Sequence, residues 1–145
     1  MNQPPRAAQW LGYGGLLPFV GLACLTLWTR PSVSSSALFD SALLAYGASI
    51  MSFMGAIHWG LAMRDGQAPD HRLLLWGVLP SLAAWLALLA GAAPGLWVVV
   101  AGLWVCFAVD RRVYPRFALQ GWLPMRLALT TVATLACGLV AWSLR

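Results

Sequence analysis

Five apolar stretches, each close to the length needed to cross a lipid bilayer, constrain the fold of this chain more than any other feature. A membrane helix needs roughly 20 apolar residues to cross about 30 Å of hydrocarbon. The stretches run approximately over residues 10–28, 37–63, 73–90, 94–109 and 124–142. Only 9% of the residues are charged, against about a quarter in soluble domains. The sequence therefore predicts an all-α integral membrane bundle of five transmembrane helices, in which residues 1–145 form a single transmembrane domain.

The arginines predict how this bundle is oriented. Cytoplasmic loops and flanks of membrane proteins carry an excess of basic residues. With five spans, Arg30 and Arg145 lie on one side of the membrane, and the other basic residues lie with the N-terminus. We therefore expect the N-terminus in the cytoplasm and the C-terminus in the periplasm. The arginines on the N-terminal side are Arg6, Arg64, Arg72, Arg111, Arg112, Arg116 and Arg126.

The first stretch has a second interpretation. Arg6 precedes it and a small-residue run, Ser34 to Ala37, follows it, as in a cleaved signal peptide. Cleavage would leave four spans. The long apolar region and the intervening Arg30-Pro31 favour a retained span instead.

The second stretch carries a row of small residues, Ala48, Ser52, Ala56 and Gly60, at four-residue spacing. Small residues let membrane helices approach each other closely. The row predicts helix packing, either within the bundle or against another membrane protein.

His58 lies on the other side of the same stretch, with Asp40, Met51 and Met54. An ionisable residue at membrane depth is expensive, so it suggests a function. Asp40 and His58 are separated by five helical turns, about 27 Å, and cannot touch. The simplest interpretation is a neutral imidazole that hydrogen-bonds a neighbouring helix.

Three ligand-binding interpretations of His58 remain open. Met51, Met54 and His58 offer soft donors of the kind that bind copper(I). A haem b could use His58 as an axial ligand. A quinone or lipid headgroup could bind near His58, with Trp59 as an apolar wall and Arg64 as a charged anchor.

The connection after the fourth stretch is basic, and we expect it to lie on the membrane surface. Arg111, Arg112 and Arg116, together with Arg126 at the start of the fifth stretch, are predicted to contact anionic lipid headgroups. Asp110 is a candidate partner for Arg126 or for its own neighbours Arg111 and Arg112. Pro115 argues against one continuous helix through the connection.

One pattern, Tyr-Gly…Ser-Phe…Gly…Ile-His-Trp-Gly between Tyr46 and Gly60, resembles a family of small multi-pass membrane proteins catalogued as a domain of unknown function. That family includes proteins of bacterial inner membranes and the mitochondrial transmembrane protein 69. The resemblance extends to the earlier LGYGGLLPFVGLACL and the later DRRVYPR, with Trp122 and Arg126 beyond it. It implies an energy-transducing membrane and supports the topology, and it brings no established activity.

The sequence holds no Walker A loop, no GxGxxG and no HExxH motif. Its arginines lie singly or in small groups between apolar stretches, which does not favour nucleic acid as a partner. We therefore expect a non-enzymatic accessory or assembly subunit of an energy-transducing, respiratory complex in the bacterial inner membrane. Its expected partners are membrane lipids and other integral membrane subunits. No cofactor is expected under this interpretation, whereas the alternative binds quinone, lipid, haem or metal through His58.

Overall fold

The computed structural model describes residues 3–29, 33–64 and 71–145. The described part is helical, and none of its residues forms a strand. Five of its helical segments are long and apolar enough to cross a membrane, which confirms the predicted all-α bundle. The helices are α1 (Arg6–Gly14), α2 (Leu16–Thr29), α3 (Val33–Arg64), α4 (His71–Ala90), α5 (Ala92–Val113) and α6 (Leu123–Ser143), with short 3-10 helices η1 (Tyr114–Phe117) and η2 (Gln120–Trp122).

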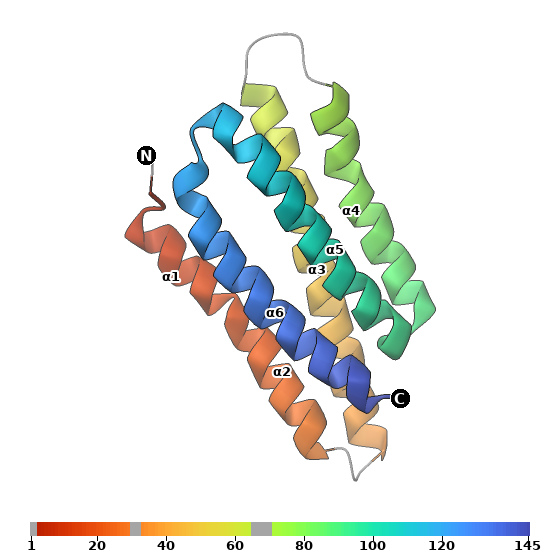
Figure 1. The fold of residues 1–145 in the computed structure, drawn as a ribbon. Helices are drawn as coiled ribbons and strands as arrows, with labels where there is room; N and C mark the ends of the chain where they lie inside the picture. The colour runs from red at the N-terminus through yellow and green to blue at the C-terminus, as the bar shows by residue number, and fades with distance from the viewer. Residues whose placement is uncertain (1–2, 30–32, 65–70) are drawn as a thin grey trace.

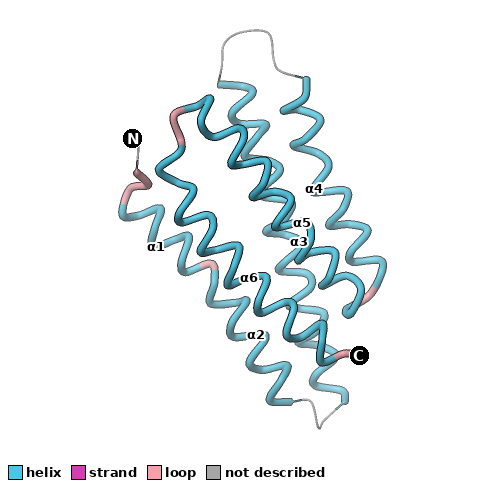
Figure 2. The backbone as a smooth tube through the Cα atoms, in the orientation of Figure 1, coloured by secondary structure: helices cyan, strands magenta, loops and turns pink. Residues whose placement is uncertain are grey.

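The first span is divided into α1 and α2 at Gly15 (Figure 2). Pro18 has no backbone N–H to bond the carbonyl of Gly14, one helical turn earlier, so the regular helix is interrupted there. The Tyr46 hydroxyl of α3 donates a hydrogen bond to the Gly15 carbonyl oxygen at 2.8 Å. The break is therefore tied to the next span.

Helix α3 is the centre of the bundle, in contact with α2, α4, α5 and α6 (Figure 1). Helix α6 packs against α5 and α2 and closes the other side. The chain begins at one end of the bundle and finishes at the opposite end (Figure 1). The start of α1, the end of α3, the start of α4 and the α5–α6 connection share the first of these ends, as five antiparallel spans require.

Glycines allow α3 and α4 to pack closely. A Cβ added at Gly55 would meet the Gly77 carbonyl oxygen and the ring of Pro80, and a Cβ added at Gly77 would meet the Trp59 indole. Trp59 also donates its indole N–H to the Leu74 carbonyl oxygen at 2.7 Å. Backbone-level contact of this kind is typical of helix pairs in lipid.

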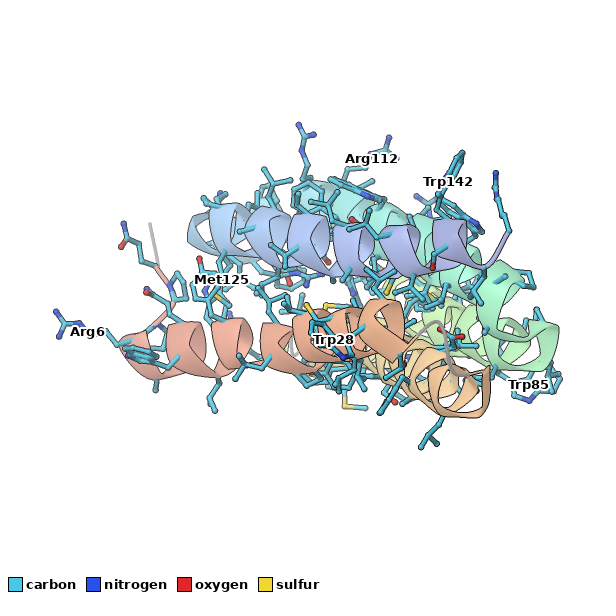
Figure 3. All side chains as sticks on the ribbon, turned by 90° about the horizontal axis from the view of Figure 1, so that it is seen from below. Arg6, Trp28, Trp85, Arg112, Met125 and Trp142 are labelled. Carbon is cyan, nitrogen blue, oxygen red and sulfur yellow. The ribbon has the colours of Figure 1, made fainter. Side chains whose placement is uncertain are left out.

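The outer surface of the bundle is apolar. Leu17, Trp28 and Leu89 are among many large apolar side chains that are mostly exposed, and Figure 3 shows Trp85 and Trp142 directed away from the helices. An apolar surface this extensive is stable only against lipid or against another membrane protein. The molecule is a multi-pass membrane protein.

Helix α5 is longer than predicted. It continues through Asp110, Arg111 and Arg112 to Val113, whereas the predicted fourth span ends at Val109. The chain then turns through η1, where Pro115 interrupts the regular helix as expected. The extension matters because it places Asp110 on a helical face that packs against the bundle, where it is 1% exposed.

Candidate functional site: a buried polar centre beside an apolar cavity

Three ionisable side chains from three different spans meet inside the bundle. His58 comes from α3, Asp110 from α5 and Arg126 from α6, and their exposed fractions are 0%, 1% and 7%. Arg126 donates from Nε and Nη2 to Asp110 Oδ2 at 2.8 and 2.7 Å. His58 Nε2 lies 3.5 Å from the other carboxylate oxygen, Oδ1. We call these three residues the polar centre.

Arg126 is therefore not where the sequence analysis placed it. It was expected at the membrane surface among lipid headgroups, and the structure buries it against Asp110. The turn through η1 and η2 returns the chain so that α5 and α6 pack side by side and bring the two side chains together. A buried charge is tolerated when a partner neutralises it and accepts its hydrogen bonds. Of the partners considered for Asp110, the structure selects Arg126.

The two ring nitrogens of His58 face different oxygens, and of the two only Nδ1 makes a hydrogen bond. Nδ1 lies 3.2 Å from the Met54 carbonyl oxygen. A carbonyl can only accept, so a hydrogen bond there requires the ring proton on Nδ1. Nε2 then faces Asp110 either with its lone pair or, when the ring is doubly protonated, with an N–H that donates to the carboxylate. Nε2 is therefore a buried polar atom between α3 and α5 whose facing oxygen, Asp110 Oδ1, lies 3.5 Å away.

This geometry does not suit the metal and haem interpretations of His58. Nδ1 faces the Met54 carbonyl oxygen and Nε2 faces Asp110 Oδ1, and His58 is 0% exposed, so neither edge of the ring is open to a haem or to a copper ion arriving from outside the bundle. Met51 is fully buried, with its sulfur against Gly102 of α5. Within the described ranges, no three His, Cys, Asp or Glu residues are grouped as metal ligands.

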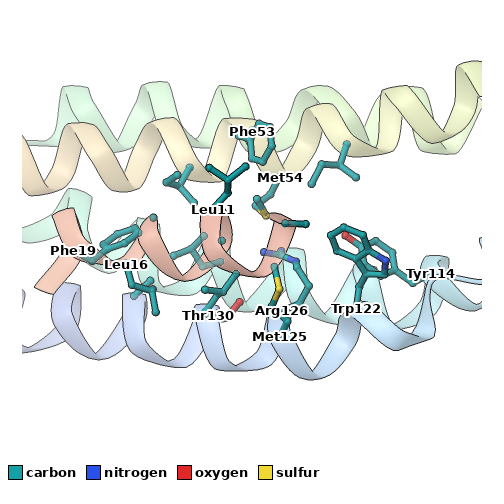
Figure 4. Close-up of a pocket in the computed structure, with 18 of the residues that line it drawn as sticks. Leu11, Leu16, Phe19, Phe53, Met54, Tyr114, Trp122, Met125, Arg126 and Thr130 are labelled. Atoms are coloured by element: carbon teal, nitrogen blue, oxygen red, sulfur yellow. The ribbon is translucent and has the colours of Figure 1, made fainter. Parts of the chain in front are cut away.

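A cavity of about 590 Å³ lies beside the polar centre, between α1, the start of α2, α3 and α6 (Figure 4). Its walls are apolar except for a few polar groups, which include the guanidinium of Arg126 and the side chains of Tyr114 and Thr130. Figure 4 shows Arg126 reaching toward Met54, with Tyr114 and Trp122 to one side. The cavity therefore adjoins the polar centre through Arg126.

The candidate residues around His58 lie in different parts of the molecule. Met54 lines the cavity, and His58 does not. Trp59 belongs to the α3–α4 contact, and Arg64 is exposed at the end of α3. Asp40, which was expected to lie too far from His58 to touch it, is buried near the opposite end of α3. The predicted group therefore does not form one site.

Sequence reasoning missed several residues of the cavity. Leu11 and Gly12 of α1 line it, as do Tyr114 and Trp122 from the α5–α6 connection. The connection had been assigned to the membrane surface. Its aromatic residues on both sides of Pro115 were the available signal, because a chain that turns sharply can return a side chain to the bundle.

The predicted row of small residues is also divided. Ala48 is buried within the bundle, whereas Ala56 and Gly60 are exposed, and a Cβ added at Gly60 would meet nothing within 4 Å. The exposed positions continue toward the start of α3 along a slightly different line. We call this line the small-residue face: Ser41, Ala45, Ser49, Ser52, Ala56 and Gly60, all exposed or half-buried.

The remaining predicted headgroup residues, Arg111, Arg112 and Arg116, are exposed at the end of the bundle. Arg112 is labelled in Figure 3, where it extends away from the helices. Their contact with anionic lipid stays a prediction.

Comparison with known proteins identifies the family. A family model described as "Protein of unknown function (DUF3429)" matches residues 4–142. The chain belongs to this family. The match covers all five spans and the residues of the polar centre, so the family assignment applies to the whole bundle.

Two relatives carry the name Transmembrane protein 69. The protein from Xenopus tropicalis is 34% identical over 138 residues, which cover 92% of this chain and 53% of the relative. The protein from Mus musculus is 30% identical over 87 residues, which cover 59% of this chain and 34% of the relative. The matched segments thus span about half and a third of these relatives. No solved structure matches the chain.

Proposed function

We propose that this protein is a non-enzymatic accessory or assembly subunit of an energy-transducing complex, respiratory in kind, in the bacterial inner membrane, with the N-terminus in the cytoplasm. The observation that carries the proposal is the small-residue face of α3. Six small side chains, from Ser41 to Gly60, leave the backbone of α3 accessible from the membrane. Lipid chains make few contacts with a face of small residues, whereas another helix can approach it closely.

The kind of complex is inferred from the family resemblance. The resemblance of the Tyr46 to Gly60 pattern to inner-membrane proteins motivates an energy-transducing membrane. Membership in the same family as Transmembrane protein 69 supports a membrane role and names no partner.

The test is extraction of the tagged protein from native membranes in a mild detergent, followed by native electrophoresis and mass spectrometry. We expect co-migration with larger membrane subunits in the wild type. Replacing both Ala56 and Gly60 by Leu should abolish co-migration, because bulky side chains keep a partner helix away. Gly21→Leu on α2 is the matched control, since a Cβ there also meets nothing within 4 Å. A protein that runs alone in every extraction would refute the proposal.

A second candidate function, binding of a lipophilic membrane molecule, is favoured by the cavity. Its volume of about 590 Å³ falls in the range that holds a small organic ligand. The sequence predicted such a ligand, quinone or lipid, near His58. The structure supports the cavity beside Arg126 as the place instead, because His58 is enclosed by protein.

A further inference from the structure

The cavity has one polar feature that sets which lipophilic molecule fits it. Among the residues that the structure describes, Arg126 is the one charged residue in its lining. Its side chain is more than nine-tenths buried, so it is not in contact with bulk water. A molecule in the cavity therefore meets a single fixed cationic donor in mostly apolar surroundings, with the Tyr114 and Thr130 hydroxyls among the few other polar groups.

The guanidinium has donors to spare on the edge that Asp110 does not use. Arginine has five N–H groups in a rigid planar fork. Asp110 Oδ2 accepts from Nε and Nη2, which form one edge of that fork. The remaining N–H groups, on Nη1 and Nη2, point away from Asp110, and one of them serves the hydrogen bond between Arg126 and the Tyr114 hydroxyl, which also lines the cavity. Since Arg126 lines the cavity, an oxygen acceptor there can accept from an N–H that neither Asp110 nor Tyr114 uses.

Charge balance favours a neutral acceptor over an anionic one. Asp110 already neutralises Arg126, and its carboxylate lies directly behind the guanidinium at 2.7 Å. An anionic headgroup would leave a net negative charge in a medium of low dielectric, which is costly. A carbonyl oxygen accepts the same hydrogen bond with no added charge.

The walls favour a flat ring with an apolar tail. Phe19, Phe53 and Trp122 line the cavity together with Tyr114, and aromatic side chains pack well against flat rings. Leu11, Phe53 and other exposed apolar residues lie at its rim, where a hydrocarbon tail can pass into the lipid.

We propose that the cavity binds a quinone, with one ring carbonyl accepting a hydrogen bond from Arg126 and the isoprenoid tail directed toward the bilayer. This inference rests on the second candidate function and specifies its ligand. It concerns binding, and it makes Arg126 the residue that recognises the headgroup, with Asp110 and His58 as positioning residues behind it.

The test uses the full chain in nanodiscs of neutral phosphatidylcholine. A photoreactive azidoquinone with a short isoprenoid tail is added, and labelled peptides are mapped by mass spectrometry. We expect saturable labelling of peptides from α1 and α6, with competition by unlabelled short-chain ubiquinone. Phosphatidylglycerol, which supplies an anionic headgroup, should not compete.

Two variants and their controls locate the contact. Arg126→Lys keeps a cation beside Asp110 and removes the second edge of the fork, so affinity should fall by about tenfold or more. Leu129→Trp fills the cavity and should reduce labelling equally. Arg112→Lys and Leu127→Trp change exposed residues outside the cavity and should leave binding unchanged. A thermal melt of each variant verifies that it is folded.

The possible outcomes distinguish binding of a lipophilic molecule in the cavity from recognition of its headgroup by Arg126. Labelling that does not saturate would overturn both this inference and the second candidate function. Saturable labelling that Leu129→Trp abolishes and Arg126→Lys leaves intact would keep the cavity as a lipophile site and overturn Arg126 recognition. Competition by phosphatidylglycerol in place of quinone would overturn the neutral carbonyl as the recognised group.

Discussion

Helix α3 is packed closely against its neighbours on one side and loosely on the other. Toward α4, glycines at Gly55 and Gly77 bring the backbones together, and Trp59 bridges to the Leu74 carbonyl oxygen. Toward α1 and α6, the same helix leaves a cavity of about 590 Å³. Protein interiors are close-packed by default. Helix α3 packs closely against α4 and borders the cavity on its other side. We therefore interpret the cavity as a feature of the fold.

The open side is also the side of the buried charges. Arg126 contacts Asp110 and lines the cavity, so the polar centre forms part of the cavity wall. The tight side, by contrast, is held by backbone proximity and one indole hydrogen bond. The comparison predicts that mutations on the two sides affect stability by different mechanisms and to different extents.

The largest effect is expected from Asp110→Asn. This change removes the carboxylate that neutralises Arg126 and leaves a buried cation without its counter-ion. Breaking a buried ion pair costs about 3–5 kcal/mol. The free energy of unfolding in mixed detergent micelles measures it. The control is Arg112→Gln, an exposed position two residues further along α5, which should change the free energy of unfolding by less than about 0.5 kcal/mol.

A smaller loss is expected from Gly77→Ala on the tight side. The added methyl group would overlap the Trp59 indole, so α3 and α4 must separate. Overpacking of this kind costs about 1–3 kcal/mol, which the same unfolding measurement detects. An unchanged stability would show that α3 and α4 are not held as closely as described.

Trp59→Phe sharpens the comparison by removing a single hydrogen bond from the tight side. The Leu74 carbonyl loses the indole donor, and the aromatic ring is largely retained. The expected cost in the free energy of unfolding is about 1 kcal/mol. Quinone binding should not change, because Trp59 does not line the cavity; a tenfold loss of binding would contradict the separation of the two sides.

The smallest effect on the free energy of unfolding is expected from Gly60→Ala, and this change should stabilise the fold. A Cβ there meets nothing within 4 Å. Alanine lowers the backbone entropy of the unfolded chain, so the free energy of unfolding should rise by about 0.5–1 kcal/mol. Association with the proposed partner should weaken at the same time, because the methyl group adds bulk to the small-residue face. Native electrophoresis with increasing detergent measures the second effect separately from unfolding.

The helices were predictable from the sequence because apolar length and turn residues decide where spans form. The buried pair was partly predictable, since Asp110 and Arg126 flank one short connection. The grouping around His58 was not. Adjacent residues on a helix point about 100° apart, so His58 faces α5 while Trp59 faces α4.

The predicted row of small residues does not lie on one side of α3, for a related reason. Residues four apart drift by about 40° around a helix at each step. A strict four-residue row therefore crosses from the buried side, at Ala48, to the exposed side, at Gly60. The exposed face follows mixed spacings of four and three residues, which only the packing of the neighbouring helices defines. The cavity depends on the break at Gly15 and on the folded connection after Pro115, and neither has a periodic signal.

A double-mutant cycle between Asp110 and Arg126 tests the central claim most directly. The claim is that these two residues form a buried pair that joins α5 to α6 beside the cavity. The free energy of unfolding is measured for Asp110→Asn, Arg126→Gln and the double variant. We predict a coupling energy of about 1.5–3 kcal/mol, with the double variant less destabilised than the sum of the two single ones. Additive effects within about 0.5 kcal/mol would contradict the pair, and with it the position of Arg126 on which the quinone site depends.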